Sequence, residues 1–210
     1  MTLNNIVLGG EHPERLLVLV HGLGADERDL AGVVPYLDPD NRFLTVLPQG
    51  PYPAPPGYAW FSFGAEDNGF TESLAALDDL VDEACAEYDL PRSEAVIAGF
   101  SQGAGMALAL GYASGTSVRP AGVLAMSGFQ PRGVDLADEE GVTYPAALVQ
   151  HGRLDPVVPP VRGNLVAQLL AERGVPTVYH EYLMQHELTM ESIADARAWL
   201  AQILQGERPT

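Results

Sequence analysis

The sequence contains no lysine, and its 11 basic residues are all arginine. Against them stand 28 acidic residues, which leaves a formal net charge of −17 at pH 7. A surface this acidic repels phosphate backbones and anionic lipid headgroups, so we expect neither nucleic-acid binding nor electrostatic docking to membranes. We interpret the acidic excess as a source of solubility.

The chain is equally poor in cysteine and in long apolar runs. Its one cysteine, Cys85, excludes an internal disulfide and a zinc site made of several thiolates. No apolar stretch approaches the ~20 residues of a membrane span, and residues 1–5 carry no basic region typical of a signal peptide. We therefore predict a cytoplasmic protein with no stable membrane insertion.

Length and apolar content are those of a globular chain. With 210 residues, 47% of them hydrophobic, the chain can bury a core without a metal or a disulfide. A prior of ~150 residues per domain favours a single domain over residues 1–210.

Short apolar runs alternate with segments of helical periodicity. Seven runs predict strands, the first of them an edge strand, over 3–8, 16–20, 42–47, 95–98, 121–126, 146–149 and 177–182. Apolar residues spaced three and four apart predict helices over 71–88, 104–112 and 189–205. This alternation predicts an α/β fold with a mainly parallel central sheet and helices on both faces. Ligands of such sheets bind beyond the carboxyl ends of the strands, so the residues that follow each strand are the candidates for chemistry.

The predicted strand 95–98 is followed by Gly-Phe-Ser-Gln-Gly at residues 99–103 and then by a helical run. G-x-S-x-G at a strand-to-helix junction is typical of a nucleophile elbow, a strained turn that raises the serine hydroxyl above the sheet. Ser101 is therefore the candidate nucleophile, in preference to a serine that only caps the helix. A serine hydroxyl is a weak nucleophile, so this hypothesis requires a histidine base and an acid that orients it.

Chain order selects the base and the acid, because in this arrangement the acid follows the serine and precedes the histidine. Asp155 lies in the turn after the strand 146–149, and His186 lies between the strand 177–182 and the last helix. We predict Asp155 as the orienting acid and His186 as the general base.

Other residues are the alternatives for these roles. Asp135 and Asp138, in a polar stretch after the strand 121–126, are the alternative orienting acids. His180 lies within a predicted strand and is expected to pack against a covering helix. His151 is expected to shape the turn before Asp155.

The tetrahedral intermediate of acyl transfer carries a negative oxygen that needs hydrogen-bond donors. One expected donor is the backbone N–H of Gln102, at the start of the helix. The other is expected in the loop His-Gly-Leu-Gly-Ala-Asp at residues 21–26, where we choose the N–H of Leu23. This loop begins like a dinucleotide motif, but Glu27 occupies the third glycine position. We therefore expect no nucleotide, and no other cofactor or metal.

Residues 49–70 are rich in proline and glycine and contain six of the 16 aromatic residues (2 Trp, 8 Tyr and 6 Phe). Irregular segments of this length are often functional, so we interpret this one as a wall or cap of an acyl pocket. Tyr58, Trp60 and Phe61 are the predicted substrate-binding residues.

These motifs together resemble the phospholipase/carboxylesterase family of α/β hydrolases, which includes the acyl-protein thioesterases. The resemblance covers essentially the whole chain in order, and it rests on the loop 21–26, Ala-Trp-Phe at 59–61, Gly-Phe-Ser-Gln-Gly at 99–103, His-Gly-Arg-Leu-Asp-Pro-Val-Val-Pro at 151–159 and Gln-His-Glu at 185–187. It implies an α/β-hydrolase fold, a triad of Ser101, Asp155 and His186, and an oxyanion hole at Leu23 and Gln102.

The chain departs from the family pattern at two positions. Members commonly have glycine before the histidine and aspartate after Trp-Phe, where this chain has Gln185 and Ser62. Substrate preference therefore transfers poorly.

We predict a cofactor-free serine carboxylesterase that hydrolyses short- to medium-chain esters through an acyl-enzyme. A lysophospholipase or an acyl-protein thioesterase would use the same triad, and a non-catalytic binding module on a hydrolase scaffold is the alternative from another class. The expected partner is a small-molecule ester, and the sequence leaves a homodimer open.

Overall fold

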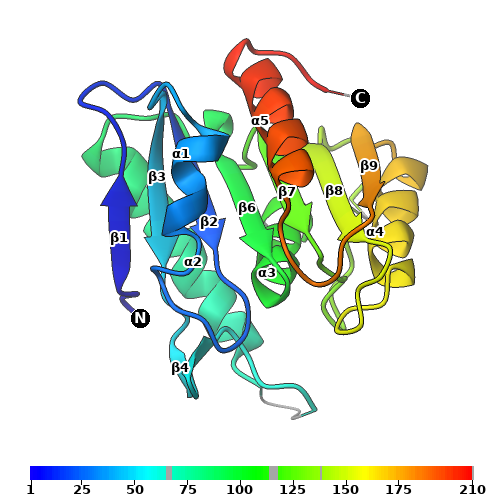
Figure 1. The fold of residues 1–210 in the computed structure, drawn as a ribbon. Coiled ribbons are helices and arrows are strands. Elements are labelled where there is room, and N and C mark those ends of the chain that lie inside the picture. Colours follow the sequence, from blue (N-terminus) through cyan, green and yellow to red (C-terminus); the bar gives the residue numbers. More distant parts are fainter. Residues whose placement is uncertain (65–67, 114–117, 138, 210) are drawn as a thin grey trace.

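The computed structural model describes residues 1–64, 68–113, 118–137 and 139–209. Its centre is a seven-stranded sheet in the order β1-β3-β2-β6-β7-β8-β9 (Figure 1). The strands are β1 (Asn5–Leu8), β2 (Arg15–Val20), β3 (Phe43–Pro48), β6 (Val96–Phe100), β7 (Gly122–Met126), β8 (Ala146–Gly152) and β9 (Thr177–Tyr182). β1 runs antiparallel to β3, and the other neighbours are parallel. The predicted parallel sheet with one edge strand added is confirmed.

Helices cover both faces of this sheet (Figure 1). One face packs against α1 (Val34–Leu37) and α5 (Met190–Leu204), and the other against α2 (Phe70–Glu87), α3 (Gln102–Tyr112) and α4 (Val161–Glu172). Short 3₁₀ turns occur at Ala31–Val33 and Arg92–Glu94. Among the described residues, no helix combines the length and the apolarity that a membrane crossing requires.

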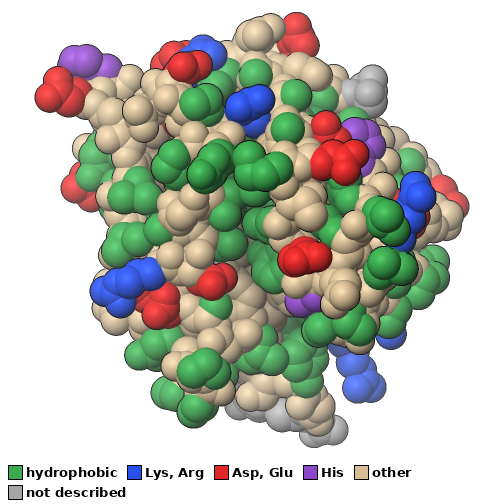
Figure 2. Space-filling model, in the orientation of Figure 1, with side chains coloured by type: hydrophobic (Ala, Val, Ile, Leu, Met, Phe, Trp, Pro, Cys, Tyr) green, Lys and Arg blue, Asp and Glu red, His purple; other side chains and the backbone are tan. Residues whose placement is uncertain are grey.

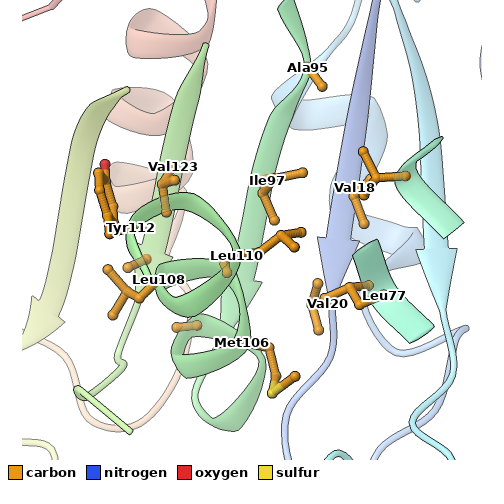
Figure 3. Close-up of a cluster of buried hydrophobic side chains, with 14 of the residues drawn as sticks. Val18, Val20, Leu77, Ala95, Ile97, Met106, Leu108, Leu110, Tyr112 and Val123 are labelled. Carbon is orange, nitrogen blue, oxygen red and sulfur yellow. The ribbon is translucent and has the colours of Figure 1, made fainter. Parts of the chain in front are cut away.

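Strand β2 illustrates why the apolar runs do not alternate with polar residues. Val18 and Val20 belong to the core beneath α2 and α3, whereas Leu17 and Leu19 belong to the core on the opposite face. Figure 3 shows Val18 and Val20 beside Leu77 of α2 in the first of these cores. A strand covered on both sides buries every side chain, so the run is uniformly apolar.

Strand β9 departs from that pattern because it forms the edge of the sheet. His180 faces α5, as expected, with Nδ1 3.1 Å from Oδ2 of Asp195. Its side chain is nevertheless 45% exposed, so this contact lies at the surface of the molecule.

The segment 49–70 is not irregular throughout. It contains a two-stranded antiparallel sheet of β4 (Tyr52–Ala54) and β5 (Gly57–Ala59), which lies outside the main sheet. The prolines and glycines of this segment favour turns and short edge strands, which conceals such a hairpin from a periodicity analysis.

Candidate active site

Ser101 occupies the junction between β6 and α3. Its backbone has φ 55° and ψ −115°, a conformation that residues with a side chain rarely adopt. The flanking glycines permit this turn, since a Cβ at Gly99 would collide with the backbone of Gly103 and a Cβ at Gly103 with the carbonyl oxygen of Val20. The close contact of α3 with β2 and β6 thus holds Ser101 in a strained conformation.

The predicted nucleophile, base and acid converge at the carboxyl end of the sheet. Nε2 of His186 lies 3.0 Å from Oγ of Ser101, and Nδ1 of His186 lies 2.7 Å from Oδ2 of Asp155. Ser101 follows β6, Asp155 follows β8, and His186 lies between β9 and α5. A carboxylate at Nδ1 keeps the proton on that nitrogen, so Nε2 can accept the serine proton.

The loop that follows Asp155 holds its carboxylate in place. Oδ1 accepts hydrogen bonds from the backbone N–H groups of Val157 and Val158, each at 2.8 Å. The side chain is fully buried, whereas that of His186 is 15% exposed. The carboxylate therefore has partners on both oxygens, and its orientation toward His186 is fixed by backbone groups.

His151 shapes this turn, as expected, and does so from the interior. Its Nε2 lies 2.9 Å from the carbonyl oxygen of Val158 and 3.4 Å from Oδ2 of Asp155. Because the carbonyl oxygen can only accept, Nε2 carries the proton. In the described part of the chain, the buried Nδ1 atom has no hydrogen-bond partner.

The glycine-rich loop after β2 lies against Ser101. A Cβ added at Gly22 would come within 3.3 Å of Cβ of Ser101. Within the described ranges, no hydrogen bond engages the backbone N–H of Leu23 or of Gln102. Both residues line the cavity that contains Ser101 and His186, so their amides remain the predicted donors to a substrate oxygen.

His21 anchors this loop. Its Nε2 accepts the backbone N–H of Gly50 at 2.9 Å, so its Nδ1 carries the proton and donates to the carbonyl oxygen of Gly22 at 2.6 Å. Burial lowers the pKa of His21, which favours the neutral form that both bonds require. The carbonyl oxygen of His21 also accepts the indole N–H of Trp60 at 3.0 Å.

The three predicted substrate-binding residues occupy different positions. Phe61 lines the cavity, but Trp60 and Tyr58 are not among the described residues that do. Trp60 is fully buried, and Tyr58 pairs with Ala25 in an isolated β-bridge. The described lining of the cavity thus includes one of the three predicted substrate-binding residues, Phe61, and substrate contact by Trp60 and Tyr58 stays a prediction.

The side chain of Gln102 has a role that the sequence did not reveal. Its Oε1 accepts the backbone N–H of Trp60, and its Nε2 donates to the carbonyl oxygen of Phe61, both at 2.8 Å. Gln102 is 1% exposed. The residue after Ser101 thus ties the turn between β6 and α3 to the aromatic segment.

A cavity of about 840 Å³ opens beside Ser101 and His186, within the usual size range of small-molecule sites. One part of its lining is aromatic and another is aliphatic, comprising Phe61, Phe63, Phe70 and Phe129, and Val157, Val158, Leu165 and Val166. The ring centroid of Phe61 lies 5.3 Å from those of Phe63 and Phe70. Both surfaces suit an apolar part of a substrate.

The alternative orienting acids lie elsewhere. Asp135 is exposed in the segment between β7 and β8, and Asp138 lies outside the described residues. Nδ1 of His186 already has a carboxylate partner in Asp155.

Comparison with known proteins agrees with this architecture. The model of the Phospholipase/Carboxylesterase family matches residues 1–204. The chain belongs to the phospholipase/carboxylesterase family. It is 28% identical over 178 residues to Acyl-protein thioesterase 1 of Debaryomyces hansenii, covering 80% of this chain and 76% of that protein. It is 26% identical over 226 residues to Acyl-protein thioesterase 1 of Candida albicans, covering 95% and 96%.

A solved structure extends this comparison. The crystal structure of esterase PE8 superposes with a TM-score of 0.84 at 26% identity, covering 97% of this chain and all of that one. The α/β-hydrolase fold is thus shown, and this member of the phospholipase/carboxylesterase family is a hydrolase.

Proposed function

We propose that this family member hydrolyses short- to medium-chain carboxylic esters, with Ser101 as nucleophile, His186 as general base and Asp155 as the group that orients it. The observation that carries the proposal is the unbroken pair of hydrogen bonds from Asp155 through His186 to Ser101, at 2.7 and 3.0 Å. Both lie in the range of about 2.6–3.2 Å that proton transfer requires.

In the proposed reaction, Nε2 of His186 takes the proton of Ser101 as Oγ attacks the acyl carbon. The backbone N–H groups of Leu23 and Gln102 stabilise the negative oxygen that develops. His186 returns the proton to the departing alkoxide, and an acyl-enzyme remains on Ser101. Water, deprotonated by the same His186, then attacks the acyl carbon, and Ser101 regains its proton as the acid leaves.

Replacement of the nucleophile tests this proposal. Ser101→Ala should reduce turnover of 4-nitrophenyl butyrate by about 10⁴-fold or more while the melting temperature is preserved. A fluorophosphonate probe should label the wild type at Ser101 and leave the variant unlabelled. A folded wild type that neither turns over esters nor reacts with the probe would instead be a binding module on a hydrolase scaffold.

A second candidate, acyl-thioester hydrolysis, is favoured by the similarity to two proteins that are both named Acyl-protein thioesterase 1. Matched oxygen esters and thioesters of acyl chains from two to 16 carbons distinguish the candidates. Each methylene buried in the cavity contributes about 0.8 kcal/mol, so kcat/KM should rise with chain length until the cavity is full. A rise that ends at medium length supports the esterase, whereas a continuing rise with thioester preference supports the thioesterase.

A further inference from the structure

We propose that Arg132 and Arg162 form an anion subsite in the cavity beside Ser101, and that the preferred substrate is therefore an ester that carries a carboxylate. This inference rests on the proposed esterase function and specifies its substrate class. The two arginines come from different segments, Arg132 from the loop after β7 and Arg162 from α4, and both line the cavity that holds the nucleophile.

The described lining of this cavity carries charge opposite in sign to the net charge of the chain. The chain as a whole has 28 acidic residues against 11 arginines. Among the described residues that line the cavity, however, the only charged types are Arg132 and Arg162, and no aspartate or glutamate is present. Figure 2 shows acidic side chains spread over the face drawn and, among the residues that it colours by type, blue and green side chains at its lower edge, where the parallel strands of Figure 1 end.

Within the described residues, neither arginine has a partner for its charge. Six of the 11 arginines form ion pairs with carboxylates in the described structure, namely Arg15, Arg28, Arg42, Arg92, Arg119 and Arg153. In the same described ranges, Arg132 and Arg162 have neither an ion pair nor a side-chain hydrogen bond, and both are exposed. Their guanidinium groups are free to bind a ligand.

The position of Arg162 is unfavourable for the helix that carries it. It is the second residue of α4, which has no acidic residue in its first turn. The N-terminal end of a helix bears partial positive charge, so a cation there destabilises the helix slightly. A residue that destabilises its own helix often has a function, and Arg162 is such a residue. An anionic ligand bound there would be attracted both to the guanidinium group and to the N-terminal end of α4.

The apolar linings beside the arginines define the rest of the substrate. Phe129 and Leu165 line the same cavity as the two arginines, so the cavity combines apolar surface with positive charge. A substrate with its ester carbonyl at Ser101 would lay an apolar spacer along these surfaces and present a carboxylate to the arginines. Guanidinium groups bind carboxylates with two parallel hydrogen bonds, which favours this anion.

The net charge of −17 does not oppose this recognition at short range. Exposed charges are screened beyond about 8 Å at physiological ionic strength, so the nearest groups dominate the potential that a bound substrate experiences. Among the described residues that line the cavity, Arg132 and Arg162 are the two that carry a full charge.

The experiment compares carboxylates with neutral amides of the same shape. One pair, mono-4-nitrophenyl adipate and 4-nitrophenyl adipamate, places the charge on the acyl side. The other pair, 4-acetoxybenzoate and 4-acetoxybenzamide, places it on the leaving group. We expect kcat/KM for the carboxylate to exceed that for the amide by at least about fivefold in one pair, and the ratio to fall in 0.5 M NaCl.

Variants connect that ratio to the two side chains. Arg132→Gln and Arg162→Gln should each lower the carboxylate-to-amide ratio of kcat/KM, and the double variant should bring this ratio near one. Arg162→Lys should retain part of the preference for the carboxylate. Arg173→Gln removes another exposed arginine from the end of α4, outside the cavity lining, and should leave the ratio unchanged.

A wild-type ratio at or below one in both pairs, or a ratio that the Gln variants do not alter, overturns the anion subsite. Ser101-dependent turnover of the neutral amides would leave the esterase proposal intact in either case. A wild type that hydrolyses no member of either pair overturns both proposals.

Discussion

Nε2 of His151 lies 3.4 Å from Oδ2 of Asp155, and both side chains are fully buried. The same nitrogen donates to the carbonyl oxygen of Val158, whose own N–H donates to the other oxygen of Asp155. His151 therefore closes the loop that holds the carboxylate, and we predict that it positions Asp155 for the proposed reaction.

Loss of this contact is expected to weaken both the fold and the reaction. His151→Ala removes a buried ring and leaves the carbonyl oxygen of Val158 without its donor, so the free energy of unfolding should fall by about 3 kcal/mol. His12→Ala, at an exposed site, is the control and should change stability little. Urea unfolding and the kcat for 4-nitrophenyl butyrate measure the two effects. Unchanged stability and kcat in His151→Ala would contradict the positioning role.

Asp155 itself should be indispensable for the rate and dispensable for folding. Asp155→Asn retains the shape of the side chain but favours the wrong tautomer of His186, so kcat should fall by about 10⁴-fold. Asp135→Asn, at an exposed position, is expected to leave kcat near the wild-type value. If Asp135→Asn lowered kcat more than Asp155→Asn does, the orienting role would belong to Asp135.

The sequence predicted the sheet and the convergence of three residues because local patterns carry both. Parallel strands buried on both faces are short uninterrupted apolar runs, as β2 and β3 are. Ser101, Asp155 and His186 each follow a strand, and the carboxyl ends of parallel strands meet at one edge of the sheet. Their order in the chain then sufficed to predict that they lie together.

Contacts between distant segments could not be predicted in this way. Gln102 and Trp60 are 42 residues apart, and nothing in the spacing shows that an amide side chain joins them. An aromatic cluster indicates a pocket wall, but which rings face the cavity depends on the hairpin of β4 and β5. The exposure of His180 likewise follows from the position of β9 at the edge, which periodicity does not reveal.

The bridge formed by Gln102 leads to a third prediction. Gln102→Ala retains the backbone N–H but leaves the buried N–H of Trp60 and the carbonyl oxygen of Phe61 unpaired, at about 1–3 kcal/mol each. The melting temperature should fall, and KM for esters should rise because the wall of the cavity loosens. Gln168→Ala, on the exposed face of α4, is the matched control. A variant as stable as this control would contradict the bridging role.

The buried His21 should make stability depend on pH. Its pKa in the folded chain is lowered from 6.5 by burial, so the unfolded chain binds a proton that the folded chain resists. The stabilisation that neutral His21 gives to the folded chain is therefore fully present above pH 6.5. It is lost as the pH falls from 6.5 toward the lowered pKa of the folded chain. Urea unfolding at pH 7.5 and 5.5 should show a larger loss in the wild type than in His21→Asn. Equal losses would show that other groups cause the dependence.

The close contact between Gly103 of α3 and the backbone after β2 leads to a fifth prediction. A Cβ at Gly103 would meet the carbonyl oxygens of Val20 and His21, which belong to a central strand and to the loop beside the nucleophile, and neither can move without disturbing the core. Gly103→Ala should therefore lower stability by about 4 kcal/mol or more and abolish ester turnover. Gly32→Ala, where an added Cβ meets no atom within 4 Å, should be neutral. Thermal melts and 4-nitrophenyl butyrate assays of both variants test this prediction. If Gly103→Ala were as stable as Gly32→Ala, α3 would have room to shift away from β2, and the prediction would be wrong.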